Sequence, residues 1–357
     1  MQRLAITGLG AATHNIHLPA YGLCSGRIEL VGGCDIDADS RKRFAAVRPG
    51  VPVFAGFAEM LGKTRPDVVV ICTPPSLHHR QCLDALAAGC HVFCEKPLVE
   101  SLIEADELIE ASAAAQRLLV VNSQFPRMKI HAAAKAAIGT EEFGKLLFVH
   151  ASQTFRPTAE TEGVWRSQLV RRVGFEFGVH VFELVRYFFG EEPLRLVAHM
   201  PNPMGGSSDV INVVSMEFSG GRAATILLDR LCKGPERYLD LRLDGEGAAV
   251  RTSIGGELRL EAGLHTRERK PYVAFHFAKG GKAVIEDGNR ARTLATDGMN
   301  PFAPATAAQL CGLLDAIESG GEPVGSARDH RRTLELVFAA YQSAESRSWV
   351  ELNPEAT

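Results

Sequence analysis

Two groups of residues in this chain carry side chains suited to proton and hydride chemistry. Lys96 stands in the triplet Glu95-Lys96-Pro97, directly after a short apolar run. A lysine at the mouth of a cofactor crevice can stabilise negative charge on an alcohol or carbonyl oxygen, whereas a lysine on a surface loop has no such role. Glu176 and His180 lie four residues apart, so on a helix they would share one face and could act together in proton transfer.

The second group also has less specific interpretations. Because apolar residues follow His180, this histidine could instead be a hydrogen-bonded residue of the core. Glu176, His180 and Glu183 could bind a metal ion, but no further cluster of ligand residues supports this, and we predict no metal site. The choice between these interpretations depends on where the predicted strands and helices place the residues.

A glycine turn near the N-terminus is typical of dinucleotide-binding folds. Gly8 and Gly10 follow the first apolar run, and Ala11 and Ala12 come directly after them. The first glycine permits a tight turn, the second lets a pyrophosphate approach the backbone, and the following helix offers N–H groups to the phosphates. Thr13 is bulkier than the usual third residue, so the prediction depends mainly on the position of the turn at the first strand–helix junction.

Asp35 follows the second apolar run and predicts the choice of cofactor. An acid here accepts hydrogen bonds from the adenosine ribose hydroxyls and repels a 2′-phosphate. The repulsion is about 4 kcal/mol for one charge pair at about 4 Å and an effective dielectric constant of about 20. We therefore expect NAD, with NADP possible because Arg41 and Arg43 would weaken the preference. The alternative is that Asp35 is only a turn residue.

Three more segments follow apolar runs, where an open α/β sheet binds its ligands. They are Thr73-Pro74, Glu95-Lys96-Pro97 and Asn122. His78 would begin the helix after the first of them. We expect all of these residues to contribute to cofactor binding. The alternatives are turns that only end a strand, and a capping or surface histidine.

The N-terminal third of the chain alternates apolar runs with helix-like stretches. The runs lack two-residue alternation, which favours strands covered on both faces and so a parallel sheet. They are Leu4–Thr7, Leu30–Cys34, Val68–Cys72, His91–Cys94 and Leu118–Val121. Ser76 is expected to cap a helix that ends at Gly89, and Ser101 with Glu104 reads as a capping box. The pattern predicts a doubly wound α/β domain over 1–123.

The remainder of the chain, 124–357, has a different pattern of apolar residues. Leu239, Leu241 and Leu243 alternate with polar residues, as in a strand with one packed face. Similar short runs, several separated by glycine-rich turns, lie at 146–155, 194–200, 209–218, 222–231 and 257–261. Helices are expected around 176–189, 305–319 and 328–346. We predict an α+β domain with an antiparallel meander.

Composition limits the possible partners. The 357 residues are 46% apolar and 23% charged, enough for two globular domains. A net charge of −3 gives no reason to expect nucleic acid or an anionic membrane. No apolar stretch approaches the ~18 residues of a membrane span, and the first run leaves no room for a signal peptide. Most of the eight cysteines lie in or beside apolar runs, so we expect reduced thiols in a cytoplasmic protein.

In combination, these segments resemble the Gfo/Idh/MocA family of NAD(P)-dependent sugar and cyclitol oxidoreductases. The resemblance runs nearly from end to end, and the order of the segments is far more specific than any one of them. The segments are Gly8-x-Gly10, His17-Leu18-Pro19-Ala20, Asp35, Thr73–His78, Ala88–Leu98, Arg127, Gly144-Lys145-Leu146, Trp165-Arg166, Gly178–Leu184 and Leu336–Ser346.

The resemblance implies a Rossmann domain followed by a domain with a large, open, mostly antiparallel sheet. In the family that sheet commonly mediates oligomers, so we expect a homodimer or homotetramer. The resemblance places Lys96 beside nicotinamide and substrate, makes His180 the acid or base, and makes Glu176 its assistant. The other residues expected to contact the substrate are Arg127, Trp165 and Arg166.

These implications predict an NAD(P)-dependent dehydrogenase. It would transfer a hydride between nicotinamide and a secondary alcohol or ketone of a sugar, sugar acid or cyclitol. Departures at Arg171–Gly174, Glu176 and Glu183 affect the substrate rather than the reaction class. Two alternatives are an NAD-binding sensor or regulatory protein on the same fold, and a lyase or epimerase that recycles tightly bound NAD.

Overall fold

The computed structural model describes residues 1–155, 166, 169–233, 238–255, 257–264, 271–278 and 280–353. The chain forms two compact units. The N-terminal unit comprises Met1–Arg127 and Phe302–Phe338, and the sheet unit comprises Met128–Pro301 and Ala339–Thr357. The sequence predicted one division after residue 123. The structure differs because the chain returns to the N-terminal unit near its end.

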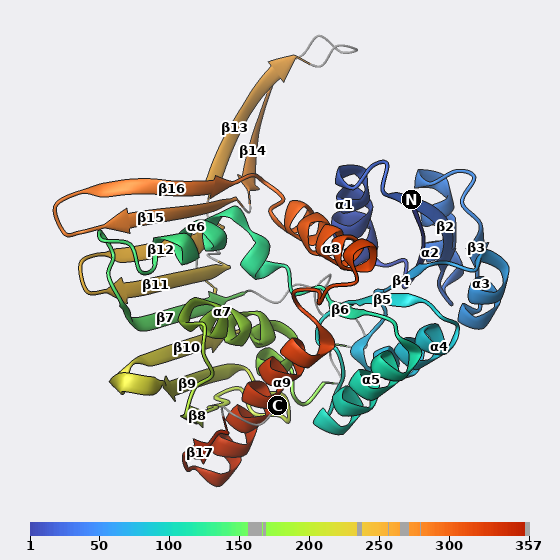
Figure 1. Cartoon of the computed structure of the whole chain (residues 1–357). Helices are drawn as coiled ribbons and strands as arrows, with labels where there is room; N and C mark the ends of the chain where they lie inside the picture. Colours follow the sequence, from blue (N-terminus) through green and yellow to red (C-terminus); the bar gives the residue numbers. More distant parts are fainter. Residues whose placement is uncertain are drawn as a thin grey trace. The chain divides into compact units, whose positions relative to one another are not determined.

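A six-stranded parallel sheet forms the centre of the N-terminal unit, in the order β3-β2-β1-β4-β5-β6 (Figure 1). Its strands are β1 Gln2–Thr7, β2 Ile28–Cys34, β3 Val53–Phe54, β4 Val68–Ile71, β5 His91–Cys94 and β6 Leu119–Val121. All four residues of β4 are buried, as the run without alternation predicted. The doubly wound α/β fold is confirmed. The strand order reverses between β1 and β4, the switch point at which such sheets bind ligands.

Helices surround this sheet, and their starts test the capping predictions. Their bounds are η1 Thr13–His17, α1 Leu18–Leu23, α2 Ala38–Val47, α3 Phe57–Thr64, η2 Pro75–Leu77, α4 His78–Ala87, α5 Leu102–Ala115, η3 Phe125–Arg127, α8 Phe302–Ser319 and α9 Ala327–Ser346, which continues into the sheet unit. Ser101 caps α5 by accepting the N–H of Glu104 at 3.2 Å. The predicted cap at Ser76 is wrong, because this serine lies within the 3₁₀ turn η2 and α4 begins only at His78.

Helix α8 belongs to the N-terminal unit because its apolar residues complete that unit's core. Leu310, Leu313 and Leu314 are fully buried in one cluster with Leu4 and Ile6 of β1. α8 also packs against α1. The predicted C-terminal helices are confirmed.

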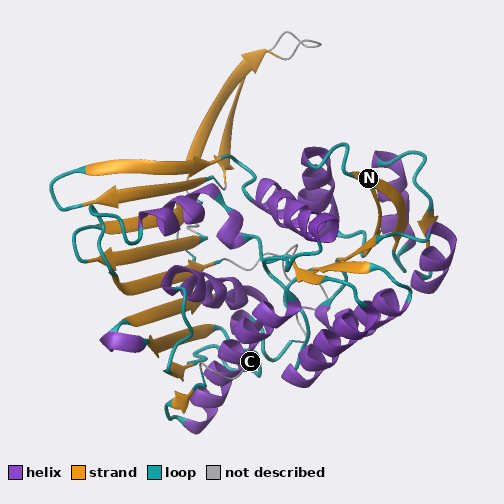
Figure 2. Ribbon diagram, in the orientation of Figure 1, coloured by secondary structure: helices purple, strands orange, loops and turns teal. Residues whose placement is uncertain are grey.

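The sheet unit contains a nine-stranded sheet in the order β16-β15-β12-β11-β7-β10-β9-β8-β17, labelled in Figure 1, and its strands are coloured orange in Figure 2. Its strands are β7 Leu146–Thr154, β8 Arg195–His199, β9 Ile211–Glu217, β10 Ala223–Asp229, β11 Leu239–Gly245, β12 Ala249–Ile254, β15 Gly281–Glu286, β16 Ala291–Asp297 and β17 Val350–Glu351. Strands β13 Glu257–Leu264 and β14 Pro271–Ala278 form a separate two-stranded sheet. β7 and β10 pair in parallel, and the other pairs in the nine-stranded sheet are antiparallel. The mostly antiparallel sheet is confirmed.

Helices cover one face of this sheet. α6 Lys129–Ala137 packs on β12, β15 and β16, and α7 Val179–Phe189 packs on β7 and β10. The strands alternate accordingly, so that in β10 Ala224, Ile226 and Leu228 are buried while the intervening residues are only partly buried. In the part of the chain that the structure describes, no helix is long and apolar enough to cross a membrane.

Candidate functional site

The turn after β1 requires glycine at one position and leaves space at another. Gly8 has φ +85°, and a Cβ there would lie 2.5 Å from the carbonyl carbon and oxygen of Cys72. A Cβ on Gly10 would meet nothing within 4 Å. Thr13 donates from its hydroxyl to the carbonyl oxygen of Gly8 at 2.5 Å, so the bulkier third residue supports the turn from inside. The backbone at Gly10 is therefore open to a ligand.

Asp35 connects this turn to the end of β2. Its carboxylate accepts the N–H of Leu9 at 2.7 Å and the N–H of Asp37 at 2.8 Å. Arg41 donates to the carbonyl oxygens of Asp35 and Ile36 at 2.8 and 2.9 Å. The carboxylate expected to contact a ribose is thus held beside the glycine turn, with a guanidinium group close by.

His78 joins the two loops that follow β4 and β5. It is fully buried; one ring nitrogen, Nε2, lies 2.8 Å from the carbonyl oxygen of Thr73, and the other, Nδ1, lies 2.9 Å from that of Pro97. Burial lowers the pKa of His78, although the facing carbonyls oppose this. The contacts of its ring are with the protein's own backbone, so His78 holds the loops that carry Thr73 and Lys96.

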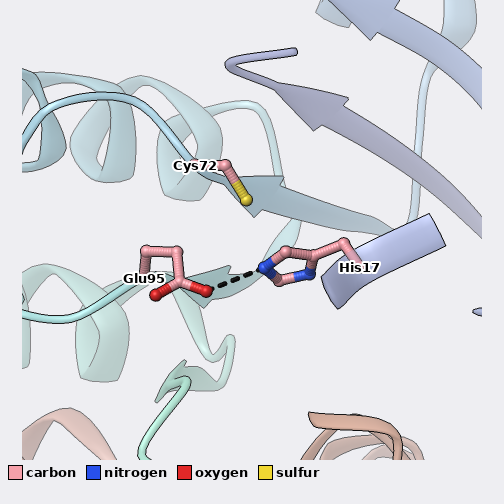
Figure 3. A group of neighbouring side chains, drawn as sticks. All are labelled: His17, Cys72 and Glu95. Carbon is pink, nitrogen blue, oxygen red and sulfur yellow. Dashed lines mark hydrogen bonds and ion pairs between the residues drawn. The ribbon is translucent and has the colours of Figure 1, made fainter. Parts of the chain in front are cut away.

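Glu95 makes three hydrogen bonds at this edge of the sheet, and Figure 3 shows the one to His17. Its Oε1 lies 2.8 Å from Nε2 of His17 and accepts the side-chain N–H of Asn122 at 2.7 Å. Its Oε2 accepts the backbone N–H of Lys96 at 3.3 Å. Asn122 also donates to the hydroxyl of Thr306 on α8 at 3.1 Å. The loop bearing Lys96 is therefore anchored directly at the carboxyl end of β5.

His17 and Glu95 form an ion pair. Burial would lower the pKa of His17, but the negative charges that Cys72 and Glu95 can carry outweigh it and raise the pKa to about 10. Burial would likewise raise the pKa of Glu95, but the hydrogen bond and charge of His17 lower it overall. Figure 3 shows the thiol of Cys72, at the end of β4, pointing toward this pair.

In the sheet unit, Glu176 and His180 lie on one helical segment and are 3% and 4% exposed. Glu176 lies in the π-helix η5, Val173–Gly178, and His180 in the α-helix α7 that follows. The expected α-helix over 176–189 thus begins as a π-helix, a feature found frequently at functional sites. Arg166 donates from Nε to Oε1 of Glu176. The structure therefore brings Glu176, His180 and Arg166 onto neighbouring positions of one unit.

Asp209 holds the start of this helical segment. Its carboxylate accepts the backbone N–H groups of Arg172, Val173 and Gly174 at 2.5, 3.1 and 3.0 Å. It also accepts the hydroxyl of Tyr341 at 3.0 Å. Sequence reasoning missed both residues, because a single aspartate before a strand and a tyrosine in a distant helix give no local signal.

The other expected substrate residues are placed as follows. Arg127 belongs to the N-terminal unit, where it donates to Oε1 of Gln309 at 2.9 Å. Arg166 contacts Glu176 in the sheet unit. Trp165 lies outside the described residues. His17 belongs to the segment His17-Leu18-Pro19-Ala20 that resembles the family, and the sequence predicted no role for it. Its residue type and its position soon after the glycine turn were visible in the sequence.

Comparison with known families matches two family models to this chain. The model of an oxidoreductase family with an NAD-binding Rossmann fold (GFO_IDH_MocA) matches residues 2–123. The model of the GFO/IDH/MocA C-terminal domain matches residues 131–251. One match lies in each unit.

Individual relatives align with most or nearly all of the chain. D-apiose dehydrogenase of Paraburkholderia graminis is 26% identical over 98% of this chain and 89% of its own length. 1,5-Anhydro-D-fructose reductase of Ensifer adhaerens is 29% identical over 82% of each chain. The crystal structure of an oxidoreductase from Agrobacterium radiobacter in complex with NAD+, L-tartaric acid and magnesium has a TM-score of 0.82, at 19% identity over 98% of both chains. This last similarity concerns the fold.

Proposed function

The chain belongs to the GFO/IDH/MocA oxidoreductase family and has its NAD-binding Rossmann domain, and from this premise we propose that it acts on a secondary alcohol or ketone of a sugar, sugar acid or cyclitol. The observation that carries the proposal is the placement of Lys96. It follows β5 of a sheet whose first turn is shaped for a dinucleotide. The names of the two sugar-converting relatives support this substrate class.

The residues at the carboxyl edge of the sheet fit NAD. The open backbone at Gly10, with Ala11 and Ala12 beside it, would receive the pyrophosphate, and Asp35 would accept the ribose hydroxyls. The loops that carry Thr73-Pro74 and Glu95-Lys96-Pro97 would lie along the nicotinamide half. Bound NAD supplies the hydride acceptor. Asp35 favours NAD over NADP, and Arg41 leaves NADP possible.

We assign the proton chemistry to three side chains. His180 takes the proton of the reacting hydroxyl, and Lys96 stabilises negative charge on the same oxygen. Glu176, which Arg166 holds, orients His180 or binds a neighbouring hydroxyl. Arg127, Trp165 and Arg166 are proposed to contact the substrate.

His180→Ala tests this assignment. Turnover is expected to fall at least about a hundredfold, because proton transfer by a positioned side chain contributes ~10²–10⁴ in rate. NAD affinity should stay unchanged, since the proposed cofactor residues lie in the other unit. The measurement is NADH absorbance with a panel of sugars, sugar acids and cyclitols, together with NAD titration. His150→Ala is the control, because His150 bonds to Thr225 across two strands of the sheet. Equal turnover of H180A and wild type would refute the role of His180.

We also propose a cytoplasmic homodimer or homotetramer formed through the nine-stranded sheet. The support is the face opposite α6 and α7, where Val213 of β9 is 42% exposed. Val213→Asp is expected to shift the mass measured by light scattering toward the monomer. A monomeric wild-type protein would contradict this part of the proposal.

A further inference from the structure

One charged pair in the N-terminal unit has no part in the chemistry assigned above. His17 is fully buried and the Glu95 side chain is only 12% exposed, with 2.8 Å between Nε2 and Oε1. The carboxylate receives three donors from three segments: His17 beside the glycine turn, Asn122 after β6, and the backbone N–H of Lys96. A carboxylate with this many partners is held in one orientation.

The charge on His17 is what allows Glu95 to remain ionised at this depth. A buried carboxylate is costly unless it is paired and hydrogen-bonded. The titratable groups that face His17 are Cys72 directly after β4, Glu95 directly after β5, and Tyr21 of α1, whose ring centroid lies 6.0 Å from that of His17. The two acidic neighbours favour the imidazolium form, in line with its raised pKa.

The same three side chains also have the donor types of a metal site. Ligand atoms of His17, Cys72 and Glu95 lie within 4.8 Å of one another. Two features favour the ion pair instead. Oε1 of Glu95 already accepts Asn122, and Nδ1 of His17 has no hydrogen-bond partner among the described residues, whereas metal-binding histidines almost always donate their second N–H to an acceptor.

The position of the pair suggests its role. His17 ends the π-helix η1 that follows the glycine turn, and Glu95 directly precedes Lys96. The pair therefore links the segment expected to bind the cofactor phosphates to the lysine expected at the reacting oxygen. We propose that His17 is a positioning residue, which as an imidazolium cation holds Glu95 and through it sets the location of Lys96 relative to the glycine turn. This inference rests on the proposed function of Lys96.

Three variants test the proposal: His17→Gln, Glu95→Gln and the double variant. His17→Gln removes the charge but keeps an N–H donor, and the expected fall in kcat is about ten- to a hundredfold, the scale of misplacing a reacting group by an ångström. KM for NAD should change less than kcat. The double variant should lose less than the product of the two single losses, because neither side chain then leaves an unpaired charge. His14→Gln is the matched control, since His14 lies on the same π-helix without the contact to Glu95.

Two readouts do not depend on turnover. ¹⁵N NMR of the histidine rings should show an imidazolium signal at about pH 8 that His17→Gln removes, well above the ordinary histidine range. The free energy of unfolding should show the same coupling between His17 and Glu95. If the wild type turns over no sugar or cyclitol, the proposed function fails while these two readouts still test the pair.

Specific results would overturn the proposal. They are a neutral His17 ring at that pH, or kcat unchanged in an active H17Q enzyme. One equivalent of zinc in the purified wild-type protein, absent from H17Q, would show that His17, Cys72 and Glu95 form a metal site rather than an ion pair.

Discussion

At the scale of single residues, Gly8 and Gly10 are expected to respond differently to the same substitution. Gly8→Ala puts a Cβ at 2.5 Å from the backbone of Cys72 at a positive φ, so stability should fall by about 1–3 kcal/mol. Gly10→Ala meets no protein atom and should leave stability unchanged while weakening NAD binding. Urea unfolding and NAD titration measure the two effects. Wild-type NAD affinity in Gly10→Ala would contradict a close approach of the pyrophosphate.

His17 makes a second prediction, for the pH dependence of stability. Its pKa is raised in the folded protein from 6.5 to about 10. A raised pKa contributes stability that is complete below pH 6.5 and is lost as the pH rises through about 10. The free energy of unfolding should therefore fall over this interval, and fall less in His17→Gln. Urea unfolding at several pH values measures the free energy of unfolding of both proteins. The contributions of other titrating groups cancel in the difference between the two. Parallel curves for both proteins would refute the ion pair.

At the scale of elements, Asp209 determines how the helical segment with Glu176 and His180 begins. Asp209→Ala removes the acceptor for three backbone N–H groups and for Tyr341. We expect a loss of about 2–3 kcal/mol in stability, the scale of hydrogen bonds to a charged group, together with reduced turnover. Asp209→Asn keeps the shape and should lose less. Stability and kcat equal to wild type in Asp209→Ala would show that the segment is held by other contacts.

The helices and strands also show which secondary structure can be predicted from local sequence patterns. The fully apolar runs located the strands well, and β5 begins and ends where the run His91–Cys94 does. Strand β3 was missed because two residues are too short for any periodicity. Helix α6 was missed because its alanine-rich stretch has no capping signal; its N-cap Met128 makes no side-chain bond. The π-helix at Val173–Gly178 depends on contacts with Asp209 and Tyr341, which are distant in sequence.

At the scale of the site, the sequence predicted residue types better than their connections. The triplet with Lys96 was identified because it follows a strand in a parallel sheet. The network around Glu95 was not, since it joins residues 17, 122 and 306 through long-range packing. His78 was expected at the cofactor, and its ring contacts are with three backbone carbonyl oxygens, those of Thr73, Pro97 and Leu98. Hydrogen-bond partners of buried side chains follow from tertiary structure, which spacing along the chain does not encode.

At the scale of the whole molecule, the N-terminal unit is built from two separate stretches of chain. Leu310, Leu313 and Leu314 of α8 complete the core around β1, and the carbonyl oxygen of Gly325 accepts the N–H of Val121 in β6. A chain that ends at Arg127 would expose the apolar surface that α8 covers. The family match to residues 2–123 therefore marks a sequence module that is shorter than the folding unit.

Because the N-terminal unit needs both stretches, we predict that residues 1–127 alone do not fold into a stable NAD-binding unit. The isolated stretch should bind a hydrophobic dye, lack a cooperative unfolding transition and bind NAD weakly. Joining 302–338 to it through a flexible glycine–serine linker should restore both cooperativity and NAD affinity, because Thr306 and the α8 leucines return to their partners. Replacing Leu310 and Leu314 by aspartate in the joined chain provides the control, and should abolish the rescue. Cooperative unfolding and full NAD affinity of 1–127 alone would show that α8 is dispensable for this unit.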